Sequence, residues 1–269
     1  MASFSVVSNL ASTGAQMHLQ GTNLSLNKAL TRLSSGFRIN TSGDDAAGLA
    51  VANTYRNTQA ILSQGVRNAN DGLSKLQIKD GALANISTLL DRLATLATQA
   101  GSSSNGVDIS KLSDEYGEIV SEITREATVG EVATASASFS VFVSSESTTS
   151  NGAVTGTIDS ATAAGLGLTT TSFTDAASAQ AALTEVKDAV DTLGDIQNTI
   201  GTLQNKLSFA INLAQAQNVN TKAAESRIRD ANIAEESANM TRFNILSQSG
   251  IAALAQANQT SSAVLSLLR

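Results

Sequence analysis

The chain has 269 residues, of which 42% are hydrophobic and only 3% aromatic, and it contains no proline, cysteine or tryptophan. The lack of cysteine excludes disulfides and thiolate metal sites. The net charge of −6 and the absence of a Lys/Arg cluster argue against nucleic-acid binding. Without proline, helices can continue for many turns, so this composition favours thin helical packing over one bulky core.

The first tail carries no charge, because Asp, Glu, Lys and Arg are all absent from residues 1–27. Asn9, Gln16 and Gln20 interrupt its apolar residues too often for a membrane span, so we expect a helix that packs against protein. Its apolar residues fall on two helical stripes, which one partner helix cannot cover together. The stripes are Val7, Leu10, Met17 and Leu24, and Leu19, Leu26, Leu30 and Leu33.

The segment that follows is expected to connect this helix to the next. In one interpretation, ion pairs of Arg38, Asp44 and Asp45 hold the segment against other elements. In the other, Asp44 simply caps the next helix. Gly36 and Gly43 bracket the segment, which indicates specific backbone turns and favours the first interpretation.

Two heptad seams dominate the middle of the chain. Apolar residues recur at steps of four and three over residues 62–100 and again over 183–214. Seams of similar length predict partners in one antiparallel bundle. After a Gly/Ser-rich turn at 101–106, apolar residues over 109–123 predict a third helix, started by Asp108 or Ser110.

Residues 130–173 differ from the rest, because they are rich in Ser, Thr, Gly and Ala. Apolar residues alternate on both sides of Asn151-Gly152, which predicts a β-hairpin with a long loop. Hydroxyl side chains near the expected tip are candidates for O-glycosylation, and an unmodified solvated loop is the alternative. The candidates are Ser144, Ser145, Ser147, Thr148 and Thr149.

The last tail repeats the character of the first, because residues 243–268 carry no charge. Two uncharged helices can cover only part of each other, and copies of the same chain are the simplest source of further cover. The sequence therefore predicts self-assembly through both tails. The candidate polymerisation residues are Phe4, Val7, Leu10, Met17, Leu24, Leu26, Leu33, Phe243, Leu246, Ile251, Leu254, Leu265 and Leu268.

The predicted fold class is mainly α: a long antiparallel helical bundle or coiled coil, a small β-hairpin segment, and terminal helices paired at one end. The expected regions are 1–34 with 236–269 (terminal helices), 35–61 with 222–235 (connecting segment), 62–129 with 174–221 (bundle) and 130–173 (β segment).

Nothing in the sequence indicates an enzyme. His18 is the single histidine, and no hydrolase triad, zinc motif or phosphate-binding glycine loop is present. We therefore expect neither a metal nor a cofactor. The N-terminus lacks a basic region followed by a continuous apolar run, so it does not read as a conventional signal peptide.

Two motifs carry a resemblance to a known family. LSSGFRINTSGDDAAGL at residues 33–49 closely resembles the N-terminal motif of bacterial flagellins, and ALAQANQTSSAVLSLL at 253–268 resembles the flagellin C-terminus. The resemblance implies a structural subunit of the flagellar filament that serves motility. Its terminal helices would form an inner layer, and its large outer domains would be missing, because the mid-chain insert is short.

The resemblance also implies a location and partners. Family members leave the cell unfolded through the flagellar type III export apparatus, so the expected location is extracellular, in the flagellum. The implied partners are further copies of the chain, the export apparatus and its chaperone, and the hook-associated and cap proteins. No nucleic acid or membrane is expected among them.

Residues 91–96, DRLATL, align with the region by which many flagellins meet Toll-like receptor 5. Arg92 and Leu96 match that region, whereas Asp91, Ala94 and Thr95 differ from it. A core role for Leu96 and a solvated role for Arg92 remain open. Two alternative functions also remain: a hook–filament junction protein of the same superfamily, and a secreted adhesin or immune-receptor ligand that acts as a monomer.

Overall fold

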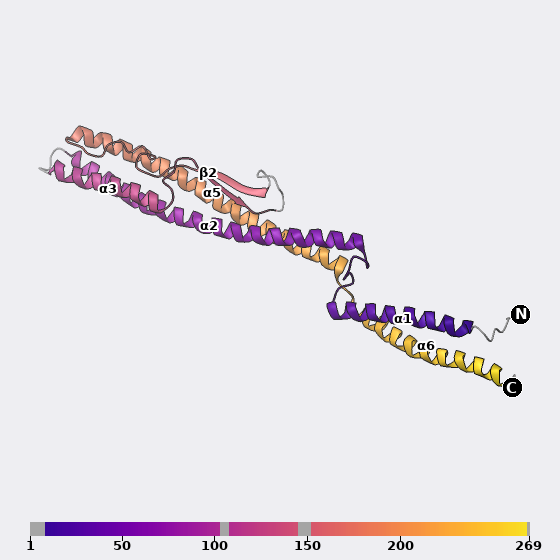
Figure 1. Cartoon of the computed structure of the whole chain (residues 1–269). Coiled ribbons are helices and arrows are strands. Elements are labelled where there is room, and N and C mark those ends of the chain that lie inside the picture. Colours follow the sequence, from indigo (N-terminus) through magenta and orange to yellow (C-terminus); the bar gives the residue numbers. More distant parts are fainter. Residues whose placement is uncertain (1–8, 103–107, 145–151, 268–269) are drawn as a thin grey trace. The chain divides into compact units, whose positions relative to one another are not determined.

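The computed structural model of the chain describes residues 9–102, 108–144 and 152–267, with side chains as far as Thr260. These residues are mainly helical with one small hairpin, as the sequence predicts. Along the chain the elements are α1 (Leu10–Ser35), α2 (Ala46–Ala100), α3 (Ile109–Val129), β1 (Ala137–Phe142), β2 (Ala153–Ile158), α5 (Ala176–Arg229) and α6 (Ile233–Leu267) (Figure 1). They form two compact units, which we call the bundle unit (Thr58–Asn220) and the tail unit (Met1–Asn57 with Thr221–Arg269).

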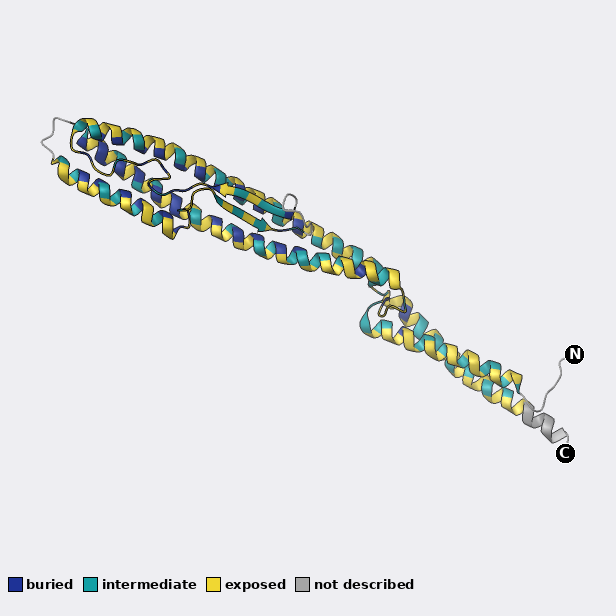
Figure 2. Cartoon of the chain, turned by 45° about the horizontal axis from the view of Figure 1, so that its top comes forward, coloured by how far each residue is buried: buried dark blue, intermediate teal, exposed yellow. Residues whose placement is uncertain are grey.

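The core of the bundle unit is built from the two heptad seams. Leu76, Leu83 and Leu90 of α2 and Ile200 and Leu207 of α5 are buried in one continuous cluster. The two helices are antiparallel, because Asn218 bonds to Ser63 near one end and Gln180 lies beside Gly101 near the other. The buried positions form the inner band of this unit in Figure 2. The predicted pairing of the seams is therefore confirmed.

Helix α3 covers one end of the bundle unit. It begins directly after Asp108, one of the two predicted starting residues, although the Asp108 side chain makes no capping hydrogen bond. Tyr116 packs edge-on against Phe173, with ring centroids 5.3 Å apart. The backbone N–H of Phe173 donates to the Ser113 hydroxyl at 3.0 Å. These contacts fasten the segment that precedes α5 onto α3.

Strands β1 and β2 form the predicted antiparallel hairpin, with Phe139 opposite Gly156 and Val141 opposite Val154. Phe139 and Val141 face the helices, and the alternating Ser138 and Ser140 face solvent. Glycine at position 65 of α2 permits the hairpin to approach this helix closely, because a Cβ atom on Gly65 would lie 2.1 Å from the Val143 carbonyl oxygen. The expected loop residues 145–151 lie outside the described part of the chain.

The tail unit centres on α1 and α6, which run antiparallel. Asn9 bonds to the Ala257 carbonyl at 3.0 Å, and Arg32, near the other end of α1, bonds to Glu236 near the start of α6. The predicted pairing of the terminal helices is thus present. Much of the expected connecting segment is helical, since only residues 36–45 and 230–232 lie outside helices. No proline interrupts the beginning of α2 or the end of α5.

Candidate functional site

The contact between α1 and α6 uses one of the two predicted stripes of α1. Leu19, Leu26 and Leu33 are half-buried on the side that faces α6. A Cβ atom on Gly250 of α6 would lie 3.1 Å from a methyl of Leu19, so the glycine lets the helices approach closely. Asn23 accepts a hydrogen bond from the Ser247 hydroxyl at 3.2 Å.

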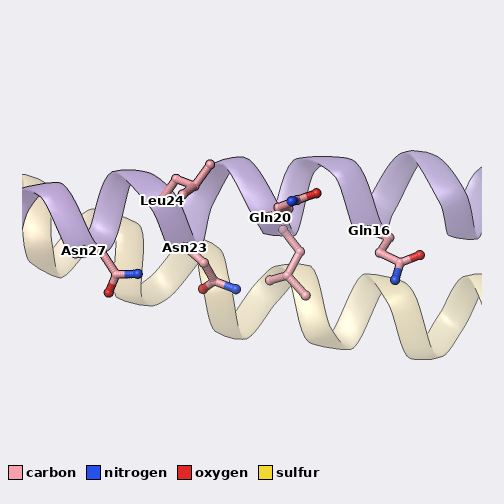
Figure 3. Close-up of a pocket in the computed structure, with 6 residues that line it drawn as sticks. Gln16, Gln20, Asn23, Leu24 and Asn27 are labelled. Carbon is pink, nitrogen blue, oxygen red and sulfur yellow. The ribbon is translucent and has the colours of Figure 1, made fainter. Parts of the chain in front are cut away.

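The other stripe of α1 remains open. Leu10, Met17 and Leu24 are 82%, 69% and 66% exposed. Figure 3 shows Leu24 pointing away from α6, whereas the neighbouring Asn23 extends on the side nearer α6. Large apolar side chains at such exposure indicate a surface that another protein covers. The helix pair therefore half-buries Leu19, Leu26 and Leu33, whereas Leu30, the fourth residue of that predicted stripe, is 44% exposed, and the other stripe stays open.

The remaining candidate polymerisation residues divide in the same way. Phe243 and Leu254 of α6 are half-buried, whereas Leu246 and Ile251 are exposed. Ile245, which was not among the candidates, is 58% exposed. Phe4, Val7 and Leu268 lie outside the described residues, and Leu265 belongs to α6 with its side chain outside them.

Asp44 links the connecting segment to α1. Its carboxylate lies 2.8 Å from the Lys28 ammonium group. It also accepts hydrogen bonds from the backbone N–H groups of Asn40 and Thr41 and from the Thr41 hydroxyl. The Lys28 contact and these backbone donors hold the pKa of Asp44 well below its usual range. The carboxylate thus organises the loop and ties it to α1.

The cap of α2 is Asp45 and not Asp44, which corrects the alternative sequence interpretation. An Asp45 carboxylate oxygen accepts from the backbone N–H of Gly48 at 2.8 Å, in the first turn of α2. Arg38 also acts differently from the ion pair expected for it. Its guanidinium donates to the Ile228 carbonyl at 2.8 Å, and its backbone N–H donates to the Arg229 carbonyl.

Sequence reasoning missed a second ion pair in this region. Arg32 of α1 lies 3.0 Å from the mostly buried carboxylate of Glu236 on α6. The Arg229 guanidinium also lies 4.2 Å above the ring of Phe37. The sequence held a partial signal, because Lys28 and Arg32 follow the first uncharged tail and Glu235 and Glu236 precede the second, although Arg242 lies nearer to that second tail.

The two receptor candidates have very different surroundings. Leu96 is fully buried in the core of the bundle unit, so a partner cannot touch it while the bundle is folded. Arg92 is exposed, and its Nε donates to the Glu115 carboxylate at 3.0 Å. Of these two candidates, only Arg92 is exposed and can contact another protein.

The glycosylation candidates are only partly covered by the structure. Ser144 is half-buried, and its backbone N–H donates to the Gly152 carbonyl at 3.1 Å. Ser145, Ser147, Thr148 and Thr149 lie outside the described residues.

Two properties of the described residues bear on the class of site. No group of three or more His, Asp or Glu side chains in residues 9–102, 108–144 and 152–267 is placed to hold a metal ion. Among the helices that the structure describes, none has the length and apolarity needed to cross a membrane.

Comparisons with known proteins point to one family at both ends of the chain. Residues 6–131 match a model of the bacterial flagellin N-terminal helical region. Residues 183–268 match a model of the bacterial flagellin C-terminal helical region. The two matches cover the tail helices and most of the bundle unit.

Several curated relatives match over almost their whole length. A flagellin of Halalkalibacterium halodurans is 36% identical over 248 residues, which cover 90% of this chain and 91% of the relative. The flagellar filament 33 kDa core protein of Treponema phagedenis is 34% identical, and the match covers 97% of this chain and 98% of the relative. A crystal structure of Bacillus cereus flagellin matches 59% of this chain and 94% of its own at 28% identity, with a TM-score of 0.46.

Proposed function

The chain belongs to the bacterial flagellin family, and we propose that it is a structural subunit that assembles with copies of itself into the bacterial flagellar filament. One relative is named as a flagellar filament core protein. The family is one of structural proteins, in keeping with a chain that has no recognisable catalytic motif.

The observation that carries this proposal is the open stripe on the α1–α6 pair. Complete burial of a leucine or methionine side chain stabilises a protein by about 1.5–3 kcal/mol, and Leu10, Met17 and Leu24 leave most of that unused within one chain. The tails also lack charge over residues 1–27 and 243–268. Burial of such a surface therefore desolvates no ion, so repeated contacts between copies are favourable.

The finer elements of the proposal concern location and partners. A filament subunit acts outside the cell, so the chain would be exported, and the flagellar type III apparatus with its chaperone is the proposed route. Hook-associated and cap proteins are the proposed neighbours at the two ends of the filament. These elements rest on membership of the family.

Removal of the last tail tests the proposal. Deleting residues 243–269 takes away most of α6 but leaves the bundle unit, whose core residues pack within Thr58–Asn220. We expect the truncated chain to keep a cooperatively unfolding bundle and to form no filaments. Electron microscopy after addition of filament seeds measures assembly, and circular dichroism measures folding.

The same preparation separates the alternatives. A monomeric adhesin or immune-receptor ligand predicts no filaments from the full chain. A hook–filament junction protein predicts only a few copies in sheared filaments, whereas a filament subunit predicts that the chain is their main component. Filaments of normal length from the truncated chain would contradict assembly through α6.

A further inference from the structure

The first residues of the chain repeat the sequence of strand β1. Residues 2–6 read ASFSV, and residues 137–141, which are all of β1 except its last position, also read ASFSV. The next position is apolar in both copies, Val7 in the first and Phe142 in the second. The first segment therefore has the β-branched and aromatic residues, and the alternation, of a sequence that forms a strand elsewhere in this chain.

Strand β1 has an edge that another strand can use. The backbone N–H of Val143 donates to the Gly152 carbonyl, so the even-numbered residues of β1 turn their N–H and C=O groups away from β2. From that side the Asn68 amide donates to the Phe142 carbonyl oxygen at 3.3 Å. Within the described residues, the outward backbone groups of Ser138 and Ser140 have no partner. Such an edge is a template for pairing with another chain.

A groove runs along this edge. It has a volume of about 420 Å³ and is lined by β1 and by Asn68, Asp71 and Lys75, which share one face of α2. Ile78 continues the same face at helical spacing and is 63% exposed. A strand in the groove can therefore lay its apolar side chains over Ile78 and over the aliphatic stem of Lys75.

We propose that this edge binds residues 2–7 of a second copy of the chain as a third strand, antiparallel to β1. Because ASFSV reads almost the same in both directions, antiparallel pairing sets Phe4 opposite Phe139 and serine opposite serine. Residues that are opposed without backbone bonds have the closest side chains in such a pair, and aromatic cross-strand pairs are stabilising. A third strand also strengthens a hairpin, which is marginal by itself.

The backbone bonds fall to the serines. In this register two serines of the incoming segment lie opposite the two serines of β1, and each pair can exchange two backbone hydrogen bonds. The pairs are Ser3 with Ser140 and Ser5 with Ser138. The serine side chains then face solvent, whereas Phe4 and Val6 face α2. The segment brings no charge into the groove, because residues 1–27 carry none.

The contact belongs to soluble chains. Phe4 and Val7 are candidate polymerisation residues, so a chain that enters a filament has to release them from the groove. The docked segment thus keeps part of the apolar tail covered before assembly. This competition with assembly rests on the proposed function, whereas the docking itself does not.

A labelled peptide tests the docking. The probe is a fluorescent peptide of residues 1–8, titrated with the full-length chain below its critical concentration for assembly. The control peptide has Phe4 and Ser5 exchanged, which keeps the composition and breaks the alternation of apolar and polar side chains. Fluorescence anisotropy should show about tenfold or weaker binding of the control peptide.

Proline substitutions locate the edge. Ser140→Pro removes an N–H that faces away from β2, so the bonds between β1 and β2 remain. Thr155→Pro is the matched control, because Thr155 lies opposite Ser140 and its N–H faces the far edge of β2. Ser140→Pro should weaken peptide binding about tenfold, and Thr155→Pro should bind as the wild type does. Circular dichroism checks that both variants keep the wild-type thermal midpoint.

Cross-linking tests the same contact without proline, because the chain has no cysteine of its own. A Ser3→Cys chain is mixed with a Ser140→Cys chain or with a Thr155→Cys chain and then oxidised. Directly opposed residues have Cα atoms within the reach of a disulfide, whereas Thr155 would lie one strand further away. A higher yield of disulfides between unlike chains with Ser140→Cys supports the inference.

Three results would overturn the inference: equal binding of the two peptides, equal binding by the two folded proline variants, or equal disulfide yields with Ser140→Cys and Thr155→Cys. If a proline variant does not fold, the peptides and the disulfides decide. None of these measurements requires a filament, so the proposed function is not affected by their failure. Failure of the wild type to assemble would contradict the proposed function and leave the docking as measured.

Discussion

The ammonium group of Lys28 lies 2.8 Å from a carboxylate oxygen of Asp44, so the end of α1 holds the loop that leads into α2. The Asp44 side chain is largely enclosed, at 14% exposure. Its other oxygen accepts from two backbone N–H groups and one hydroxyl of the same loop. The loop is thus folded around a carboxylate whose ionised form makes the ion pair and strengthens these hydrogen bonds.

The stability of the tail unit should therefore fall in acid. Because the folded-state pKa of Asp44 lies below its ordinary value of 3.8, its contribution is present above that pH and is lost as the pH falls towards the folded-state value. Asp44→Asn should lower the thermal midpoint at pH 7. The thermal midpoint of this variant should then fall less between pH 5 and pH 3 than that of the wild type. Asp91→Asn, at an exposed position, controls for the removal of one charge. If the thermal midpoint of Asp44→Asn falls between pH 5 and pH 3 as much as that of the wild type, this role of Asp44 is contradicted.

A charge on the open stripe should block assembly without unfolding the chain. Leu24 is 66% exposed, so Leu24→Glu should change the stability of the monomer by about 0.5 kcal/mol or less. In the filament the same glutamate would be buried without a partner, at a cost of several kcal/mol in every subunit. Ser140→Glu on the exposed face of β1 is the matched control. Equal polymerisation of both variants, measured by sedimentation, would rule out burial of this stripe.

The seat of the hairpin depends on Gly65. Gly65→Ala would place a Cβ atom 2.1 Å from the Val143 carbonyl oxygen, and overpacking of this kind costs about 1–3 kcal/mol. Gly81→Ala on the same helix meets nothing within 4 Å and should instead stabilise α2 by about 0.5–1 kcal/mol. Chemical unfolding measures the free energy of unfolding of each variant. The two substitutions should change it in opposite directions if the hairpin packs as described, and in the same direction if it does not.

Arg92 is the remaining candidate for receptor contact, because Leu96 is buried. A guanidinium group combines several directed hydrogen bonds with aliphatic contact, which is common at interface hot spots. Arg92→Ala should lower the signal of the monomer in a reporter-cell assay for Toll-like receptor 5, and intact filament should signal less than monomer. Arg125→Ala removes a similarly exposed arginine, which pairs with Glu122 on α3. Equal signals from the wild-type monomer, the filament and both variants would exclude this site.

Periodic patterns made much of the fold predictable. The heptad seams of α2 and α5 predicted a bundle because every step of four or three returns to the same helix face. Leu76, Leu83 and Leu207 are accordingly buried. The alternation of Phe139 and Val141 with serine predicted a hairpin for the corresponding reason, with a period of two.

The contacts of the connecting segment and of the neighbouring ends of α1 and α6 could not be predicted from local sequence patterns. Arg32 and Glu236 are 204 positions apart, and only the antiparallel pairing of α1 with α6 brings them together. Asp44 and Asp45 are adjacent and chemically alike, so the sequence did not show which one would cap α2. The capping role depends on where the helix begins, which is the least certain feature of any helix pattern.

The hairpin has a consequence for how chains of this kind can differ in length. The backbone N–H of Val143 donates to the Gly152 carbonyl oxygen at 2.9 Å, so these two residues lie side by side at the base of the hairpin. Each doubling of a loop closed in this way costs only about 0.6 kcal/mol. Foreign sequence, from a short epitope to a folded domain, can therefore be spliced between these two residues while α2 and α5 keep their packing. The base of the hairpin is therefore a site where insertions, engineered or evolved, should be tolerated.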